Sequence, residues 1–198
     1  MASNPKVCKY LDIPLQHISD RVLSNMHRHI DSARTRDIIS RLREKVPGVV
    51  LRTTMIVGHP GEGPLEFEEL MNFCREAAFE RLGAFMYSEE EGTYGARTFD
   101  DDVPSEVKQV RLDSLMQQQA DISLAFNRSR VGSVQRVIVD SVAPGGKLVC
   151  RSQYESPEVD GEIIVTVPDG TDMQALVGQF IQVRITGADL YDLEAESV

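Results

Sequence analysis

Tryptophan is absent from this 198-residue sequence, and cysteine is scarce. The three cysteines, Cys8, Cys74 and Cys150, lie far apart along the chain. Their separation matches neither a disulfide framework nor a local zinc or iron–sulfur motif. Cys74 falls on the apolar side of a predicted helix, so we expect it to be a small core residue. Cys8 is expected to be exposed.

Long apolar runs are also missing. No window approaches the length needed to span a bilayer, and no basic segment leads into an apolar one, as it does in a secretory signal. Hydrophobic residues make up 41% of the chain and charged residues 26%, which is ordinary for a globular protein. We therefore expect a cytoplasmic protein of one or two domains, without membrane association.

Positive charge is in deficit, most of all in the last third of the chain. The net charge is −10 overall. Residues 131–198 hold 4 Lys and Arg against 11 Asp and Glu, a balance of −7. An acidic surface repels phosphate backbones and attracts basic partners. The charge pattern therefore argues against RNA binding by this segment.

The first half of the chain alternates between strand and helix patterns. Strand-like segments lie at 10–15, 49–57 and 82–87, and helical patterns with one apolar side separate them. Such spacing suits βα units, because a parallel crossover must contain a helix. Residues 1–103 are therefore predicted to form an α/β domain with a parallel sheet.

A polar segment, 89–104, leads into a long helical stretch that begins at Ser105 and continues to about Phe126. We interpret residues 104–130 as a linker helix. Its expected apolar side consists of Val107, Val110, Leu115, Ile122 and Phe126.

From about Val131 the pattern changes to short strands separated by turns. The strand candidates are 134–139, 147–152, 162–167, 180–186 and 191–193. Five short strands in so few residues predict a small antiparallel β-barrel over residues 131–198, of a kind often used for binding.

Four segments are similar, in the same order, to motifs of one known family. They are YLDIPLQHIS at 10–19 followed by MHR at 26–28, RTTMIVGHPGE at 52–62, FMYSEEEGT at 85–93, and PEVDG at 157–161 followed by YDL at 191–193. The first three resemble the radical S-adenosylmethionine methylthiotransferases, and the last resembles their TRAM domain. The resemblance implies the last three strands of a partial radical-SAM (β/α) barrel, followed by a TRAM-like barrel.

That family has two branches with different acceptors. One modifies an aspartate of small-subunit ribosomal protein number twelve, and the other modifies an adenosine of tRNA. The Gln-His ending at 16–17 is similar to the protein-modifying branch, and the acidic tail suits a basic ribosomal protein as partner. A tRNA adenosine methylthiotransferase and a non-catalytic binding module remain as alternatives.

The sequence departs from the family at the metal site. The resemblance implies S-adenosyl-L-methionine and two 4Fe-4S clusters in the full-length parent, but this chain has no CxxxCxxC motif and none of the cluster ligands. We therefore expect a C-terminal fragment that begins near the fourth of six barrel strands and is inactive alone. No catalytic or metal-binding residue is assigned.

The resemblance implies cofactor-binding roles for Gln16, His17, Arg52, Ile56 and Tyr87. Gln16 could bind the ribose or methionyl group, or only satisfy backbone groups. His17 could contact the cofactor, or serve the entry to the next helix. Arg52 needs an anion, either the cofactor carboxylate or an internal one. Ile56 and Tyr87 could line the adenine pocket, or simply pack in the core.

Two further features each allow a ligand contact or a structural role. Arg28 could reach a carboxylate in the barrel mouth, or form a surface salt bridge. The glycine-rich loop at 58–63 precedes a predicted helix, so its N–H groups could face a polar ligand, or the glycines could serve only the turn.

Overall fold

The computed structural model describes residues 1–198 and divides them into two compact units. Apart from the first two residues, one unit is Leu11–Gln119, and the other combines Ser3–Tyr10 with Ala120–Val198. We call them the α/β unit and the barrel unit. No helix is both long and apolar enough to cross a membrane.

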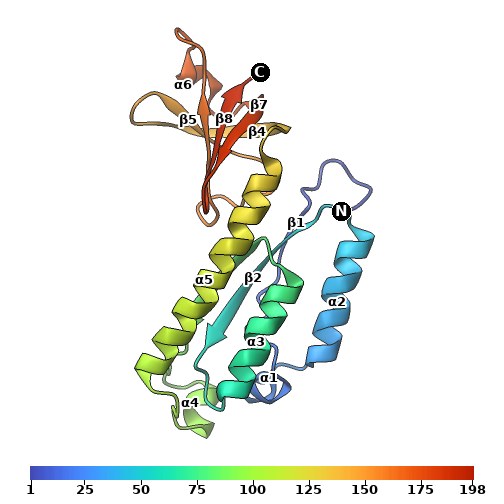
Figure 1. Ribbon diagram of the computed structural model, residues 1–198, viewed down its shortest axis with the longest axis vertical. Helices are drawn as coiled ribbons and strands as arrows, with labels where there is room; N and C mark the ends of the chain where they lie inside the picture. The colour runs from blue at the N-terminus through green and yellow to red at the C-terminus, as the bar shows by residue number, and fades with distance from the viewer. The chain divides into compact units, whose positions relative to one another are not determined.

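The α/β unit is built on a three-stranded sheet in the order β1-β2-β3 (Figure 1). Strands β2 and β3 are parallel, and a parallel bridge joins Gln16 to Met55 of β2. The strands and helices of this part are β1 (Tyr10–Asp12), α1 (Asp20–Asn25), α2 (Ser32–Lys45), β2 (Val50–Val57), α3 (Pro64–Ala77), β3 (Arg81–Met86), α4 (Tyr94–Thr98) and, as far as Gln119, α5 (Ser105–Arg130). The predicted α/β order with parallel strands is confirmed. The short helix α4 was not predicted and lies inside the segment interpreted as a polar loop.

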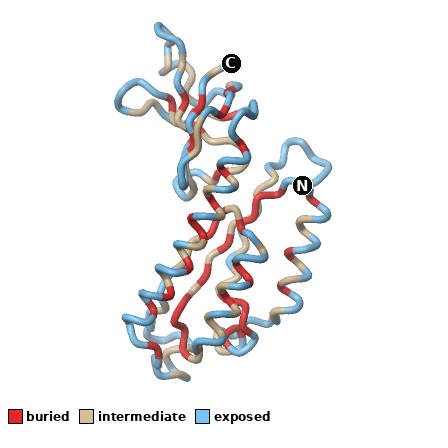
Figure 2. The backbone as a smooth tube through the Cα atoms, viewed as in Figure 1, coloured by how far each residue is buried: buried red, intermediate tan, exposed pale blue.

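Strand β2 has one buried side and one side that is partly exposed. Leu51, Thr53, Met55 and Val57 are buried, and the residues between them are of intermediate exposure. The buried side chains share a core with residues of α2, α3 and α5, including Ile39, Leu70, Phe73, Cys74 and Leu115. Figure 2 shows this buried track along β2. Helices thus cover one side of the sheet, and Arg52, Thr54 and Ile56 share the other.

Helix α5 buries mostly polar residues, which corrects the predicted apolar side. Val107 is 38% exposed and Val110 is 64% exposed, although Leu115 is fully buried as expected. Polar side chains are buried because each reaches a hydrogen-bond acceptor; Gln119 Nε2, for example, donates to the carbonyl of Phe79 at 2.9 Å. The buried polar residues of α5 are Lys108, Arg111, Gln119, Ser123, Asn127 and Arg130.

The barrel unit contains a closed barrel with the strand order β4-β5-β6-β8-β7. Its elements are β4 (Val134–Ala143), β5 (Lys147–Arg151), β6 (Ile163–Thr166), α6 (Met173–Leu176), β7 (Phe180–Ala188) and β8 (Leu193–Ser197). Inward side chains, such as Val137, Leu148, Ile163 and Ile185, form one apolar core. The predicted five-stranded barrel is confirmed, with one difference: β6 and β8 are parallel, whereas all other pairs are antiparallel.

A buried ion pair lies beside this barrel. The Arg130 guanidinium contacts the Glu155 carboxylate, whose side chain is 2% exposed. Ser152 also donates to that carboxylate through its N–H at 2.9 Å and its hydroxyl at 2.7 Å. Burial alone would raise the pKa of Glu155, but the charge and hydrogen bonds of Arg130, with those of Ser152, lower it.

Candidate functional site

A pocket of about 540 Å³ opens where the strands of the α/β unit end. Its walls include Gln16 after β1, Ile56 near the end of β2, and Tyr87 directly after β3. Ligands of open α/β sheets bind outside the carboxyl ends of the strands. This cavity, which we call the strand-end pocket, has a volume in the range of small-molecule sites.

Gln16 is held in an uncommon backbone conformation at the rim of the pocket. Its N–H donates to the carbonyl of Thr54 at 2.9 Å, and its carbonyl accepts from the N–H of Ile56 at 2.7 Å. Its φ of +73° lies in the left-handed region, which costs free energy for a residue other than glycine. Because the backbone groups are used by β2, the side-chain amide remains for the pocket.

Tyr87, directly after β3, lines the pocket. Its N–H donates to the carbonyl of Val57 at 2.8 Å, and its own carbonyl accepts from Lys108 Nζ at 3.1 Å. The Tyr87 hydroxyl is buried and has no hydrogen-bond partner in the protein. Burial, together with the nearby Glu89 and Asp101 carboxylates, raises its pKa. Solvent does not reach this hydroxyl, so Tyr87 offers the pocket other atoms of its side chain or backbone.

His59 also lines the pocket and was not recognised from the sequence. The side chain is buried, and Nδ1 lies 3.0 Å from the carbonyl of Pro60. A carbonyl can only accept, so Nδ1 carries the proton and Nε2 is an acceptor in the neutral ring. Burial lowers the pKa of His59, although the Pro60 carbonyl opposes that shift. The only sequence signal was a histidine in a loop after a predicted strand.

His17 does not line the pocket and lies instead in a fully buried network. Its Nδ1 accepts from the N–H of Ser19 at 3.0 Å, so Nε2 carries the proton and donates to Glu62 Oε2 at 3.0 Å. Glu62 Oε1 accepts from Arg111 Nη1 at 2.7 Å and from the N–H of Gly58 at 2.9 Å. The geometry matches the alternative in which His17 makes a contact at the entry to α1, because it accepts a hydrogen bond from the N–H of Ser19.

The N–H groups of the loop at 58–63 are used internally. Those of Gly58, Gly61 and Gly63 each donate to a carboxylate of the same unit. The acceptors are Glu62, Asp102 and Glu66. In the structure these three donors are therefore occupied by protein carboxylates.

Arg52 also lies outside the walls of the strand-end pocket. It is on the open side of β2, where its Nη1 lies 2.7 Å from Asp12 Oδ2. An ion pair with an internal carboxylate was one of the two alternatives for this residue, and it is the one that the geometry shows.

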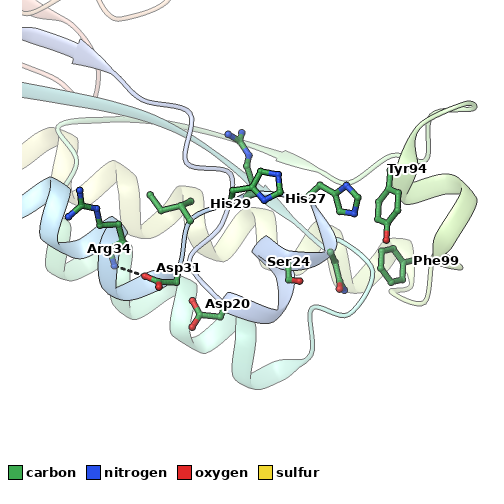
Figure 3. Close-up of a pocket in the computed structure, with 11 residues that line it drawn as sticks. Asp20, Ser24, His27, His29, Asp31, Arg34, Tyr94 and Phe99 are labelled. Carbon is green, nitrogen blue, oxygen red and sulfur yellow. Dashed lines mark hydrogen bonds between the residues drawn. The ribbon is translucent and has the colours of Figure 1, made fainter.

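A second cavity, of about 590 Å³, adjoins the first (Figure 3). We call it the α1–α2 pocket, because most of its walls come from the end of α1, the start of α2 and the connection between them. Both cavities are lined by Asn25, Arg28 and Tyr94. The ring of His27 lies against that of Tyr94, with 3.5 Å between centroids. The two pockets are therefore adjacent, with Arg28 at their common wall.

The structure has no group of three or more His, Cys, Asp or Glu residues that could hold a metal ion. Cys74 and Cys150 are buried, as expected for Cys74, and burial raises the pKa of each thiol to about 12. Cys8 is exposed, as predicted.

Comparison with known proteins gives the same two-part division. Residues 1–74 match the radical SAM superfamily, and residues 131–198 match the TRAM domain. The predicted order of folds, a partial radical-SAM region before a TRAM-like barrel, is confirmed. Coproporphyrinogen III oxidase (HemN) from Escherichia coli, a radical SAM enzyme, superposes with a TM-score of 0.47 and 15% identity, over 89% of this chain and 41% of that one.

Several curated proteins match over the length of the chain, each named ribosomal protein uS12 methylthiotransferase RimO. The protein from Porphyromonas gingivalis is 48% identical over 198 residues, covering 100% of this chain and 45% of its own length. Those from Bacteroides thetaiotaomicron and Flavobacterium johnsoniae are 47% and 42% identical, each covering 99% of this chain and 44% of their own lengths. The chain thus spans less than half the length of the curated relatives it matches.

Proposed function

Because this chain is a RimO-like member of the radical S-adenosylmethionine methylthiotransferases, we propose that it is the cofactor-binding and acceptor-docking part of an enzyme that methylthiolates an aspartate of ribosomal protein uS12. The observation that carries this proposal is the strand-end pocket, which gathers Gln16, Ile56 and Tyr87. These are three of the five residues for which the family resemblance implies contacts to the cofactor.

The pocket residues fit S-adenosylmethionine in their chemistry. Ile56 offers an apolar surface for the adenine ring, and Tyr87 lines the same pocket. The Gln16 amide can both donate and accept, which suits ribose hydroxyls or the methionyl group. When bound, S-adenosylmethionine supplies the methyl group and the hydrogen-abstracting radical of the family's reaction. These residues bind and orient it.

The iron–sulfur clusters do not fit the residues of this chain. Cluster ligands are cysteine thiolates within reach of one another. Cys74 and Cys150 lie in the apolar cores of different units, and no metal-binding group of side chains exists. We therefore propose that these 198 residues bind the cofactor without turning it over, and that the clusters are held by other residues of the full-length enzyme.

The acidic barrel unit is proposed to contact the basic acceptor protein. Of the 11 acidic residues in 131–198, all but Glu155 and Asp160 are exposed. Glu194 and Glu196 point outward from β8, alternating with buried Leu193 and Ala195. An exposed acidic surface favours a basic protein and repels a phosphate backbone.

Cofactor binding is tested by calorimetry with S-adenosylmethionine on the wild type and on Gln16→Asn. Asparagine tolerates the left-handed backbone but is one methylene shorter. Loss of one hydrogen bond of about 1 kcal/mol should weaken binding about fivefold. Gln117→Asn, at an exposed position of α5, is the matched control and should bind as the wild type does. No binding to the wild type would contradict the proposed role of the pocket.

Acceptor docking is tested separately, by titrating the chain with the basic ribosomal protein and with tRNA across a salt series. Binding to the protein that weakens with salt, without binding to tRNA, is the expected result. Binding to tRNA would refute the charge argument and favour an RNA acceptor.

A further inference from the structure

One cationic side chain, that of Arg28, lies at the common wall of the two adjacent pockets. We propose that Arg28 binds a ligand carboxylate there. Two sources fit this chemistry: the side chain of the acceptor aspartate, entering through the α1–α2 pocket, and the methionyl end of S-adenosylmethionine in the strand-end pocket. The inference rests on the proposed function for the identity of these two ligands, but not for the site itself.

Arg28 has spare hydrogen-bonding capacity and unneutralised charge. Its guanidinium makes one hydrogen bond, from Nη2 to the carbonyl of Pro14 at 3.2 Å, and no ion pair. Arginine has five N–H donors, and its planar fork suits a carboxylate held by two parallel hydrogen bonds. In a chain of net charge −10, an arginine at a pocket wall without a carboxylate partner is available for an anionic ligand.

The backbone holds Arg28 in a fixed position at the end of α1. The N–H of Arg28 donates to the carbonyl of Leu23 at 2.8 Å, and the N–H of His27 donates to that of Ser24 at 3.0 Å. These bonds, with His27 at a φ of +55°, form a Schellman motif. That position usually holds glycine, so histidine costs free energy there. Its ring contact with Tyr94 offsets part of the cost.

Two carboxylates line the α1–α2 pocket, and each already accepts a hydrogen bond from the protein. Asp20 Oδ1 accepts from the N–H of Ser32 at 2.6 Å, and Asp31 Oδ1 accepts from the N–H of Arg34 at 2.7 Å. Figure 3 shows Asp31, which caps α2, and Asp20, the first residue of α1, away from His27 and Tyr94. Since these carboxylates would repel a second one, an anionic group is expected beside Arg28, at the wall shared with the strand-end pocket.

Four probes separate the two sources of the carboxylate. They are a short peptide containing aspartate, the same peptide with asparagine, S-adenosylmethionine, and methylthioadenosine, which lacks the amino-acid portion. Each is titrated into the wild-type chain, Arg28→Gln and the control Arg75→Gln, whose exposed arginine lies on α3 and lines neither pocket. The Schellman motif uses only backbone atoms at position 28, so Arg28→Gln should fold normally.

Loss of the charged hydrogen bonds should weaken binding about tenfold for one carboxylate probe. If the source is the acceptor, Arg28→Gln binds the aspartate peptide more weakly than the wild type does and binds the asparagine peptide equally well. If the source is the cofactor, Arg28→Gln binds S-adenosylmethionine more weakly than the wild type does and binds methylthioadenosine equally well. The proposal is overturned if Arg28→Gln binds the aspartate peptide and S-adenosylmethionine as tightly as the wild type does. It is also overturned if the variant loses the same affinity for the asparagine peptide and methylthioadenosine.

The same titrations separate this inference from the proposed function. A wild type that binds neither S-adenosylmethionine nor methylthioadenosine contradicts the proposed cofactor pocket. Arg28 is then judged by the aspartate peptide alone: a tenfold loss in Arg28→Gln still supports it, and unchanged binding refutes it.

Discussion

Replacing Glu62 with glutamine should destabilise the α/β unit far more than removing any surface charge. The Glu62 side chain is fully buried, and it faces the guanidinium of Arg111 and the imidazole of His17. Glutamine has the same shape but no charge, so Arg111, whose side chain is 10% exposed, loses its counter-ion. Breaking a buried ion pair by removing one partner costs about 3–5 kcal/mol.

The hydrogen-bond pattern adds a second penalty. In Glu62→Gln, the carboxamide oxygen can keep the bonds from Arg111 and Gly58, which both go to Oε1. The amide nitrogen then faces the Nε2–H of His17, so two donors meet. His17 cannot move its proton to Nδ1 without losing the bond from the N–H of Ser19. Glu62→Gln should therefore lower the free energy of unfolding by about 3–5 kcal/mol or more.

Hydrogen exchange of the β2 amides measures this change within the α/β unit alone, whatever the stability of the barrel unit. A loss of about 3 kcal/mol corresponds to exchange more than about 100-fold faster. The matched control is Glu76→Gln, which breaks an exposed pair with Arg36 and should cost less than about 1 kcal/mol. If Glu62→Gln accelerates exchange no more than Glu76→Gln does, the network does not hold this unit together.

Two further predictions concern single positions. Gly58→Ala should lower the free energy of unfolding at least twice as much as Gly48→Ala, by denaturant titration. Both glycines have positive φ, but a Cβ at Gly58 would lie 2.2 Å from Lys108 Cγ, whereas at Gly48 nothing lies within 4 Å; equal losses would refute the steric argument. Because the pKa of Glu155 is lowered in the folded state, its pair with Arg130 stabilises the protein above about pH 4.5, the ordinary value, and that stability is lost as the pH falls further. Thermal unfolding should therefore show Glu155→Gln less stable at neutral pH, with the difference shrinking in acid; a difference independent of pH would contradict this assignment.

The family resemblance implied that Gln16, Ile56 and Tyr87 share one site, and the topology of the sheet agrees with it. Each lies at or just after the end of a strand, and the carboxyl ends of parallel strands meet at one edge of a sheet. The β-branched run of 49–57 also predicted the bounds of β2 to within one residue. Local pattern was sufficient for β2, but the pocket residues came from the family resemblance, which also implied His17 and Arg52, and these two do not line the pocket.

The polar side of α5 could not be predicted, because its partners are distant in the sequence. Lys108 contacts the carbonyl of Tyr87, and Arg111 contacts Glu62. Periodicity alone favours burying Val107 and Val110, which the structure exposes. His59 was missed for the same reason, since its burial depends on tertiary contacts rather than on neighbours in the chain. A buried polar side chain is recognisable only once its acceptor is known.

The parallel pairing of β6 with β8 also has a consequence for synthesis on the ribosome. Strand β8 pairs with both β6 and β7 and closes the barrel between them. Until β8 has emerged, β6 and β7 each present an unpaired edge, and such edges invite pairing with other chains. The barrel therefore cannot close stepwise as its strands appear. A chain that ends before residue 193 should therefore fail to close the barrel and associate with other chains, whereas a chain that includes β8 should be compact.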